Sequence, residues 1–511
     1  MNLFAKKPLN VLMAEAADSE KGLKRTLSAG SLIALGIGAI IGAGLFVRTA
    51  AAAAQNAGPS VTLGFIVAAI GCALAGLCYA ELSSSIPIAG SAYTYSYATL
   101  GELIAWIIGW DLILEYAVGA ATVGIAWSEY LNNLLVNVLH LKPIPYEWCH
   151  SPFEHSIPDA AGAITHGMIN LPALGIVALL TLLLIKGTQE SAVVNSLIVI
   201  AKVAIVILII IIGWGFINPA HHEPYIPPAG TYTDHQGISH NFGGIMGILG
   251  AAGVVFFAFI GFDAVSTAAQ EAKNPKRDMP IGILGSLAVC TVLYILFAHV
   301  LTGVASTEDF RTTGKEASVA FAIEKYMTGY SWLAKLVTVA ILAGFSSVIL
   351  VMLLGQSRVF YSMSRDGLLP KSFSAVHPKF KTPYKANLMI LVLVGLFAAF
   401  IPGDIVGDMT SIGTLFAFML VCAAVIVMRK TNPEMPRQFK TPMVPLVPIL
   451  GIVVCGAMIF GLGWTNWARL AGWLLIGFII YFGYSRYHSK LQKGQLVEPK
   501  DPPAPKDPEF I

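Results

Sequence analysis

The sequence predicts an all-α polytopic membrane protein, and its composition and its hydropathy pattern both support this class. Of the 511 residues, 56% are hydrophobic and only 12% are charged, and the mean hydropathy is +0.71. Soluble domains carry about 25% charged residues, so this chain has too little charge to cover a water-exposed surface. The composition therefore excludes a soluble enzyme, a disordered chain and a nucleic-acid-binding domain. Long apolar runs, rather than short alternating segments, exclude a transmembrane β-barrel.

Twelve apolar segments have a length close to the roughly 20 residues that cross a bilayer as a helix. They lie at residues 28–54, 60–83, 104–123, 171–185, 191–213, 244–269, 281–304, 333–354, 386–401, 405–428, 447–462 and 467–484. The fourth, ninth and eleventh segments are short, so their ends are the least well defined. An even number of spans places both ends of the chain on the same side of the membrane.

The distribution of Lys and Arg supports this count and predicts the orientation. With a cytoplasmic N-terminus, 24 of the 32 Lys and Arg residues fall on the cytoplasmic side, 7 fall on the outer side, and Lys202 lies within a span. An excess of Lys and Arg in cytoplasmic segments is the rule for helical membrane proteins. We therefore expect a multi-pass protein of the cell (inner) membrane with both termini in the cytoplasm.

Glycines interrupt the first predicted span. The segment GIGAIIGAG at 36–44 has four glycines in nine residues, and each glycine inside a helix costs up to about 1 kcal/mol relative to alanine. Close packing of small residues against a neighbouring helix is one explanation. We favour an unwound segment near the middle of the bilayer, because exposed backbone is tolerated at that depth only where it lines a protein cavity.

The sixth predicted span carries a matching interruption. The segment FFAFIGFD at 256–263 places Gly261 and Asp263 inside an apolar helix. Interrupted spans at corresponding positions of two halves are typical of transporters built from five-plus-five inverted repeats. At such breaks one half-helix offers free N–H groups, which suit a carboxylate, and another offers free carbonyls, which suit an ammonium group. Together they fit an α-amino acid.

This pattern divides the chain into four parts. Residues 1–27 form a cytoplasmic N-terminus, and residues 28–428 form a ten-helix transport core with repeats at about 28–213 and 244–428. Residues 429–486 contribute two additional transmembrane helices. Residues 487–511, rich in Pro, Lys and Asp, are predicted to be a disordered cytoplasmic tail.

Four charged residues lie within or beside the predicted spans at membrane depth, and each is a functional candidate because a buried charge is costly. Asp111 and Glu115 lie four residues apart on one face of the third span, Asp263 follows the break in the sixth, and Lys202 lies mid-span among aliphatic residues. Structural roles stay open: pairing for Asp111, a neutral hydrogen-bonded carboxyl for Glu115, and snorkelling to an interface for Lys202. A mid-membrane lysine can exchange a proton or take the place of a bound sodium ion, which favours proton coupling.

An ordered set of motifs resembles the amino acid–polyamine–organocation (APC) superfamily, and within it bacterial members of the cationic amino acid transporter family. The resemblance covers roughly residues 20–490. Each motif is weak alone, but their order along twelve spans is specific. The motifs are GIGAIIGAG at 36–44, AGSAYTY at 89–95, GWD at 109–111, LEY at 114–116, FD at 262–263, EAKNP at 271–275, RDMP at 277–280 and MSRDGLLP at 363–370.

The resemblance implies a LeuT-type fold, with broken helices 1 and 6 in a ten-helix core and two extra helices. It implies that the backbone of Gly42, Ala43 and Gly44 holds the carboxylate of a substrate. It also implies that carbonyls near four residues hold the amino group, namely those of Ile40, Phe257, Ala258 and Ile260. Ala43 departs from relatives that carry a hydroxyl at this position, so a side-chain contact to substrate is absent.

Side chains are assigned by the same resemblance. Phe257 is similar to an aromatic gate over the substrate. Lys202, our candidate for proton coupling, matches the family's lysine of the fifth span, which takes the position of a sodium ion and links the first and eighth spans. Glu115 and Asp263 match acidic residues at the side-chain end of the pocket. In the eighth span, small residues around Ser346 and Ser347 leave room for a long side chain.

The leading interpretation is a secondary active transporter that takes up amino acids with protons by alternating access. The expected substrates are cationic (Arg, Lys or ornithine) or a broad set that includes small neutral amino acids. An amino acid or amine exchanger and a non-pumping sensor stay open as alternatives, whereas no nucleophile–base pair at membrane depth supports an enzyme. We expect no cofactor and no metal site, the proton gradient as driving force, and a monomer in the lipid bilayer, with a small accessory membrane subunit as an open alternative. The sequence does not define the role of the two long, His-containing outer loops at about 132–170 and 214–242.

Overall fold

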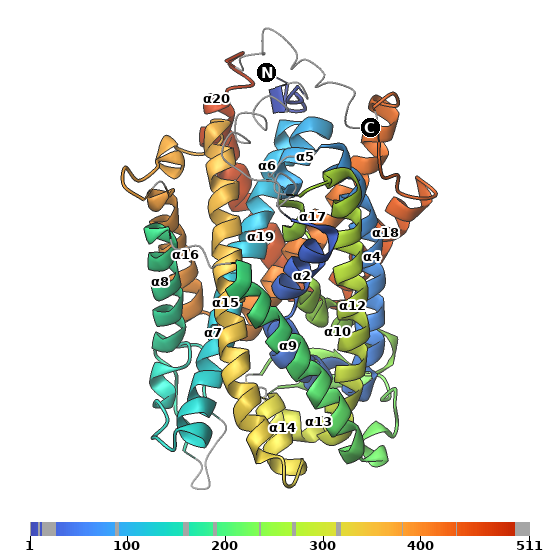
Figure 1. The fold of residues 1–511 in the computed structure, drawn as a ribbon, viewed down its shortest axis with the longest axis vertical. Helices are drawn as coiled ribbons and strands as arrows, with labels where there is room; N and C mark the ends of the chain where they lie inside the picture. The colour runs from blue at the N-terminus through green and yellow to red at the C-terminus, as the bar shows by residue number, and fades with distance from the viewer. Residues whose placement is uncertain are drawn as a thin grey trace.

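The computed structural model describes residues 2–8, 11–12, 27–86, 91–156, 163–187, 192–234, 237–267, 272–312, 318–380, 382–435 and 437–495. Helices dominate the described residues, and most run along the long axis of the molecule (Figure 1). The short helices α5 (Ser91–Thr99) and α20 (Arg486–His488) lie at one end of the bundle. The short helices α13 (Thr307–Thr312) and α14 (Ser318–Tyr326) lie at the other.

Among the described residues, eight helical segments are long and apolar enough to span a membrane. They are Gly44–Ser85, Glu102–Val138, Leu197–Phe216, Gly244–Ser266, Pro275–Val304, Ser331–Arg365, Gly403–Thr431 and Trp464–His488. Four shorter apolar helices are Ala29–Ile40, Leu171–Lys186, Tyr384–Phe400 and Leu446–Gly461. These segments overlap all the predicted spans, and the chain is an integral membrane protein.

The first half of the chain contains α2 (Ala29–Ile40), a π-helical turn η2 (Gly44–Arg48), α3 (Thr49–Ala52), η3 (Ala53–Ala57), η4 (Gly58–Ser60), α4 (Val61–Ser85), α5, α6 (Glu102–Ile113), η5 (Leu114–Val118), α7 (Gly119–Asn133), η6 (Leu134–Val138), η7 (Tyr146–Trp148), α8 (Leu171–Lys186) and α9 (Ala192–Gly213). The second half begins with η8 (Trp214–Phe216), η9 (Pro219–His222), β1 (Gly230–Thr233), β2 (Ser239–Phe242), α10 (Gly244–Phe256), η10 (Phe257–Phe259), α11 (Ala264–Thr267) and α12 (Pro275–Val304). It continues with α13, α14, α15 (Ser331–Arg365), η11 (Lys371–Ser374), α16 (Tyr384–Phe400), α17 (Gly403–Thr431), α18 (Leu446–Gly461), α19 (Trp464–Ile480), η12 (Tyr481–Ser485) and α20.

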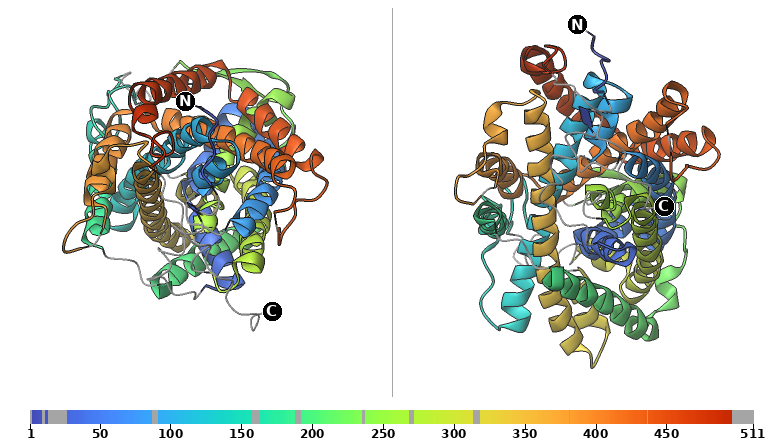
Figure 2. Two further views of the ribbon diagram at one scale, coloured as in Figure 1. Left: turned by 90° about the horizontal axis from the view of Figure 1, so that it is seen from above. Right: turned by 45° about the horizontal axis from the view of Figure 1, so that its top comes forward.

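Helix packing brings the two halves of the chain together. Helix α4 packs against α12, α10 and α18, α7 packs against α15, and α8 packs against α16. Helix α9 crosses the bundle obliquely and contacts α2, α12 and α15 (Figures 1 and 2). As a result, α2 and α10 lie inside the bundle, where their glycines and small side chains permit close approach.

The segments between the long helices hold structure that hydropathy does not reveal. Strands β1 and β2 form an antiparallel hairpin in which Gly230 pairs with Phe242 and Thr233 with Ser239. Helices α13 and α14 follow α12, and α5 lies between α4 and α6. All four features are too short or too polar to register as membrane spans.

The C-terminal prediction needs a correction for residues 487–495, which pack onto the bundle instead of forming a free tail. The hydroxyl of Ser489 donates to the Glu102 carboxylate, and the Lys490 amide donates to the Asp366 carbonyl at 3.0 Å. The buried Glu102 also accepts the hydroxyl of Tyr481 at 3.0 Å, so polar contacts order this segment. The rest of the predicted tail, 496–511, lies outside the described residues.

Candidate functional site

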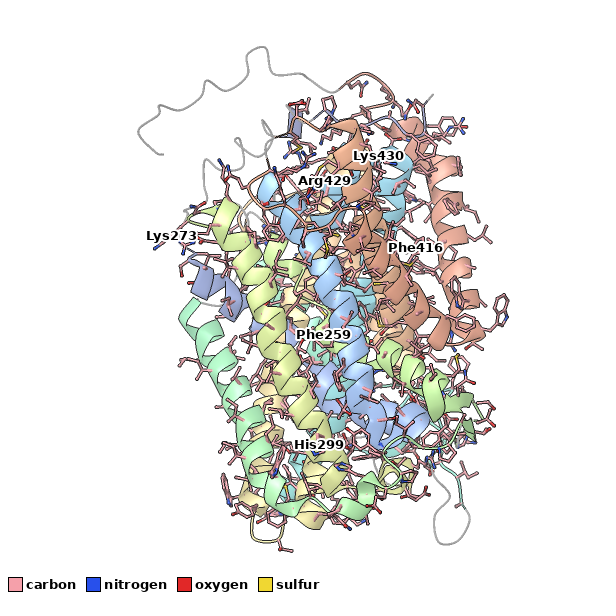
Figure 3. The ribbon with its side chains drawn as sticks, turned by 90° about the vertical axis from the view of Figure 1, so that its right-hand side faces the viewer. Phe259, Lys273, His299, Phe416, Arg429 and Lys430 are labelled. Carbon is pink, nitrogen blue, oxygen red and sulfur yellow. The ribbon has the colours of Figure 1, made fainter. Side chains whose placement is uncertain are left out.

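Both predicted interruptions are present as breaks in the helices. Helix α2 ends at Ile40, and Ile41 adopts an extended conformation with ψ of 104°. Helix α10 ends at Phe256, a single 3₁₀ turn follows, and Ile260 is extended with ψ of 135°. Gly261 then has φ of +114°, a conformation that residues with a Cβ rarely adopt. Phe259 of the second break lies at mid-height in the bundle, between Lys273, Arg429 and Lys430 at one end and His299 at the other (Figure 3).

The two breaks lie against each other. A Cβ placed on Gly44 would be 2.2 Å from the Ala258 Cα atom, so the two backbones are in direct contact there. A Cβ on Gly261 would be 2.9 Å from the Ala39 carbonyl oxygen. Glycine at 44 and at 261 therefore permits an approach that no other residue would allow without a shift of the backbone.

One side of the first break presents amide groups. Gly42 and Ala43 lie between α2 and η2, and among the described residues no backbone or side-chain atom accepts a hydrogen bond from either amide. Gly44 begins η2, where the first amides of a helix have no intrahelical acceptor. Unsatisfied amides at the positive end of a helix favour an anionic group such as a carboxylate.

The other side of the breaks presents carbonyl groups. The carbonyl oxygens of Ile40 and Ala258 each lie 3.0 Å from the hydroxyl of Tyr294, on α12. The Phe257 carbonyl accepts from the Ile260 amide at 3.3 Å, so Phe257 and Ile260 belong to the same turn. Ile40 and Ala258, from two different helices, thus offer carbonyls to one point.

Lys202 lies beside the first break. It is 3% exposed, and its Nζ atom donates to the Gly38 carbonyl at 2.9 Å. A Cβ on Gly344 of α15 would be 2.8 Å from the Lys202 Cε atom, so the lysine stem fills the space above that glycine. Lys202 therefore connects α9 with α2 and α15 in the interior of the bundle, and does not snorkel to an interface.

Helix α15 meets the first break through Val348. A Cβ on Gly42 would be 3.3 Å from a methyl carbon of Val348. Ser347 is buried, and the Ser346 hydroxyl donates back to the Leu342 carbonyl of its own helix at 2.9 Å. The side chain of α15 in contact with Gly42 is therefore an apolar one.

Carboxyl groups cluster on the side of the breaks toward α5. Asp263 is fully buried and accepts the hydroxyl of Tyr116 at 2.7 Å, and the Glu115 carboxyl group lies beside it. Asp111 is also fully buried, and neither its oxygens nor those of Glu115 have a hydrogen-bond partner among the described residues. The pairing considered for Asp111 is thus not seen, whereas Glu115 and Asp263 come together as a carboxyl pair able to hold a proton or a cation.

On the opposite side, Arg48 of η2 connects the first break to α17. Its side chain is 3% exposed, donates to Asp404 at 3.1 Å, and forms a second, shorter ion pair with Asp408. Gln55 also donates to Asp404, at 3.1 Å. Arg48 is one of the seven Lys and Arg residues assigned to the outer side from the sequence, and this pairing was not predicted, because nothing in the sequence links residues 48 and 404.

The structure brings most of the predicted site residues to one place: Ile40, Gly42, Ala43, Gly44, Phe257, Ala258, Ile260 and, beside them, Lys202. Glu115 and Asp263 form the separate carboxyl cluster next to it. Tyr294 and Val348 contact the breaks but were not predicted, since a tyrosine or valine inside an apolar helix gives no signal of its own.

Comparison with known protein sequences shows which family the chain belongs to. A sequence model of a family described as amino acid permease matches residues 27–484. The branched-chain amino acid permease BcaP of Bacillus subtilis is 44% identical over 96% of this chain and 99% of its own length. The methylthioribose transporter of the same organism is 41% identical over 96% of this chain and its whole length. The chloroplastic cationic amino acid transporter 9 of Arabidopsis thaliana is 36% identical over 88% of this chain and 74% of its own.

These relatives are named as permeases and transporters, not as enzymes. The match spans the broken helices and nearly the whole of the chain, which confirms the resemblance seen in the motifs. The chain therefore belongs to the amino acid permease family of the APC superfamily.

Proposed function

We propose that this membrane protein is a proton-coupled symporter that binds a zwitterionic amino acid between its two helix breaks. The observation that carries the proposal is the pairing of donors and acceptors at one place. The amides of Gly42 and Ala43 lack an acceptor among the described residues. Beside them, the carbonyls of Ile40 and Ala258 converge on the hydroxyl of Tyr294. The first pair suits the α-carboxylate and the second suits the α-ammonium group.

The architecture that we propose has twelve spans in a LeuT-type arrangement of five-plus-five inverted repeats and two additional helices. Contacts between α4 and α12, α7 and α15, and α8 and α16 support it, because each pair joins corresponding members of the two repeats. Alternating access around two broken helices is the mode of transport that this arrangement serves. The excess of Lys and Arg on one side supports cytoplasmic termini in the cell membrane.

Neutral, branched side chains are the substrate class that we propose first. Val348 lies against Gly42, and a small cavity adjoins the first break. Apolar residues and the stem of Lys202 line it: Ile41, Phe46, Lys202, Ile205, Ala340, Ile341, Gly344 and Phe345. The name of the Bacillus relative as a branched-chain permease agrees with such a lining.

Cationic amino acids are the second candidate class, because of one specific feature. Glu115 and Asp263 are fully buried and lie side by side with no basic side chain bonded to them among the described residues. A long cationic side chain reaching them would gain a partner in a region where an unpaired charge costs several kcal/mol.

Lys202 is the group that we propose for proton coupling, with the proton gradient as driving force and no cofactor. The working unit proposed is a monomer, alone or with a small accessory membrane subunit. An exchanger and a non-pumping sensor are the competing activities. They differ in flux: a symporter accumulates substrate, an exchanger shows counterflow only, and a sensor shows neither.

Uptake of labelled L-leucine into proteoliposomes with an imposed pH gradient tests the proposal. We expect accumulation above equilibrium when the outside is acidic, and collapse of that accumulation when a protonophore is added. Competition by the twenty amino acids and by methylthioribose then ranks the substrates. Dependence on sodium, or counterflow without accumulation, would contradict proton symport, and competition by Arg alone would favour the cationic class.

A further inference from the structure

Tyr294 of α12 is placed at the junction of the two helix breaks. Its side chain is fully buried, and its ring packs against Phe65 and Phe259 with centroid separations of 5.6 and 5.3 Å. Its hydroxyl group lies 3.0 Å from the Ile40 carbonyl oxygen and 3.0 Å from the Ala258 carbonyl oxygen. One side chain therefore contacts the end of α2 and the turn after α10 at the same time.

The hydrogen-bonding capacity at this point is unbalanced. A tyrosine hydroxyl donates one proton, whereas two carbonyl oxygens carry four lone pairs between them. Buried acceptors without a donor are costly, and the low dielectric of the interior strengthens any donor that reaches them. A substrate ammonium group, with three N–H donors, has the chemistry that these remaining lone pairs attract.

The geometry points to Tyr294 as a positioning residue for the ammonium group of the substrate, an inference that rests on the proposed function. Its hydroxyl holds the Ile40 and Ala258 carbonyls at one spacing, so that their free lone pairs face a single ammonium group. Two carbonyl dipoles aimed at the same point repel each other, and without the shared proton the two breaks would separate. The substrate would then have to draw them together, and its binding would weaken.

The neighbouring Lys202 strengthens this assignment, because it serves the same row of carbonyls. Lys202 bonds the Gly38 carbonyl at 2.9 Å and Tyr294 bonds that of Ile40, two residues further along the broken end of α2. Tyr294 alone of the two also reaches the second break, through Ala258. Loss of its hydroxyl should therefore affect the ammonium site without removing the lysine contact.

The test compares wild type with Tyr294→Phe, which removes the hydroxyl and keeps the ring that packs against Phe65 and Phe259. The probes are L-leucine and its 2-hydroxy acid analogue, which has the same carboxylate and side chain but no ammonium group, with L-arginine as a third probe. We expect the Kd of the amino acid to rise about tenfold, the effect of losing roughly one buried hydrogen bond. The Kd of the hydroxy acid should change by less than about twofold, because this analogue has no ammonium group and makes no contact that the substitution removes.

Two controls separate positioning from folding. Tyr481→Phe removes another buried hydroxyl, which donates to Glu102 at 3.0 Å. Tyr481 is distant in sequence from both breaks, so this variant should leave both Kd values unchanged. Incorporation of 4-aminophenylalanine at position 294 restores a donor and should restore leucine affinity, whereas 4-methoxyphenylalanine should not. These two non-natural variants also test the role of the donor at position 294 if Tyr294→Phe does not fold.

The outcomes that overturn the inference are distinct. Equal weakening of leucine and the hydroxy acid, or no rescue by the amino analogue, would make Tyr294 a structural residue. Tighter leucine binding in Tyr294→Phe would mean that the hydroxyl competes with the substrate and does not position its site. If wild type binds neither leucine nor arginine, the proposed function fails and the role of Tyr294 fails with it.

Discussion

The Nζ atom of Lys202 donates a hydrogen bond of 2.9 Å to the carbonyl oxygen of Gly38, just before the point where α2 breaks. A continuous helix would bond that carbonyl to the amide of residue 42, and the break removes this partner. The lysine of α9 replaces it and places a cation at the negative end of the α2 dipole. Proton loss from Lys202 would remove the positive charge and one N–H donor from this contact, which is the physical basis of the coupling that we propose for it.

Replacement of Lys202 by Ala should therefore separate binding from coupling. The amides of Gly42 and Ala43 and the carbonyls of Ile40 and Ala258 stay in place, so we expect substrate binding to be retained. Accumulation driven by a pH gradient should be lost, because the proposed proton-carrying group is absent. Binding to purified protein and uptake into proteoliposomes under an imposed gradient measure the two effects.

Lys186→Ala is the matched control, because this lysine is exposed at the end of α8. It should leave both binding and accumulation unchanged. Normal accumulation by the Lys202→Ala variant would show that Lys202 is structural and that the coupling group lies elsewhere.

Gly44→Ala should disrupt the proposed substrate site, because the added methyl group would clash with the backbone of the second break. The added methyl group would lie 2.2 Å from the Ala258 Cα atom and 2.5 Å from its nitrogen. Overpacking of this kind costs about 1–3 kcal/mol or more, and relief of the clash requires the two breaks to separate. We expect a lower temperature of thermal unfolding and loss of the stabilisation that substrate gives to wild type.

Gly175→Ala in α8 is the control, since a Cβ at this position meets nothing within 4 Å. It should keep both the unfolding temperature and the response to substrate. If Gly44→Ala matched it, the two breaks would not be in contact in the working protein.

The position of the breaks followed from the sequence because four glycines crowd into nine residues of the first span, and Gly261 and Asp263 interrupt the sixth at a corresponding position. The depth of Lys202 and Asp263 followed as well, since a charged residue in a long apolar run has few explanations. The residues that contact the breaks could not be predicted from the sequence. Whether Val348 or Ser347 meets Gly42 depends on the rotation of α15 about its axis, and a nearly uniformly apolar helix carries no signal of that rotation.

Contacts between residues of different helices could not be predicted from the sequence either. Tyr294 and Ile40 are separated by 254 positions in the chain, and their contact depends on how α12 packs on α2. The ordered C-terminal segment was missed for a related reason. Its contact with Glu102 pairs Ser489 with a residue 387 positions earlier, whereas composition alone reads residues 487–495 as part of a polar tail.

Asp309 should stabilise the pair of short helices α13 and α14 in a pH-dependent way. Burial alone would raise the pKa of Asp309. Donors from Lys325 at 2.5 Å, the Ser306 hydroxyl at 2.6 Å and the Tyr326 hydroxyl at 2.7 Å outweigh burial and hold the pKa below its usual range. A lowered carboxyl pKa stabilises the folded state above the unfolded pKa of about 3.9, and the effect is lost as the pH falls below that value.

Asp309→Asn should therefore lower the unfolding temperature by several degrees at neutral pH, because hydrogen bonds to a charged group contribute about 1.5–3 kcal/mol each. The difference between variant and wild type should shrink as the pH falls below about 4, where wild type loses its carboxylate. Thermal unfolding of both proteins between neutral and acidic pH measures it. A difference that stays constant across that range would show that the Asp309 charge contributes nothing.

Glu115→Gln decides between the two substrate classes. Glu115 and Asp263 are fully buried and adjacent, and only a substrate with a charged side chain needs their negative charge. If cationic amino acids are carried, uptake of Arg should fall by about tenfold or more, since the loss of one partner of a buried charge pair costs several kcal/mol. Uptake of Leu or Ala should fall much less.

Competition of labelled substrate by unlabelled Arg, Leu and Ala in both proteins is the measurement. Asp111→Asn is the control, because this carboxyl is equally buried and lies one helical turn from Glu115, and it should leave the ratio of Arg to Leu uptake unchanged. Equal loss of all substrates in Glu115→Gln would assign Glu115 to the fold or to the proton path. No competition by Arg in wild type would leave neutral amino acids as the substrates, with the carboxyl pair as a site for a proton.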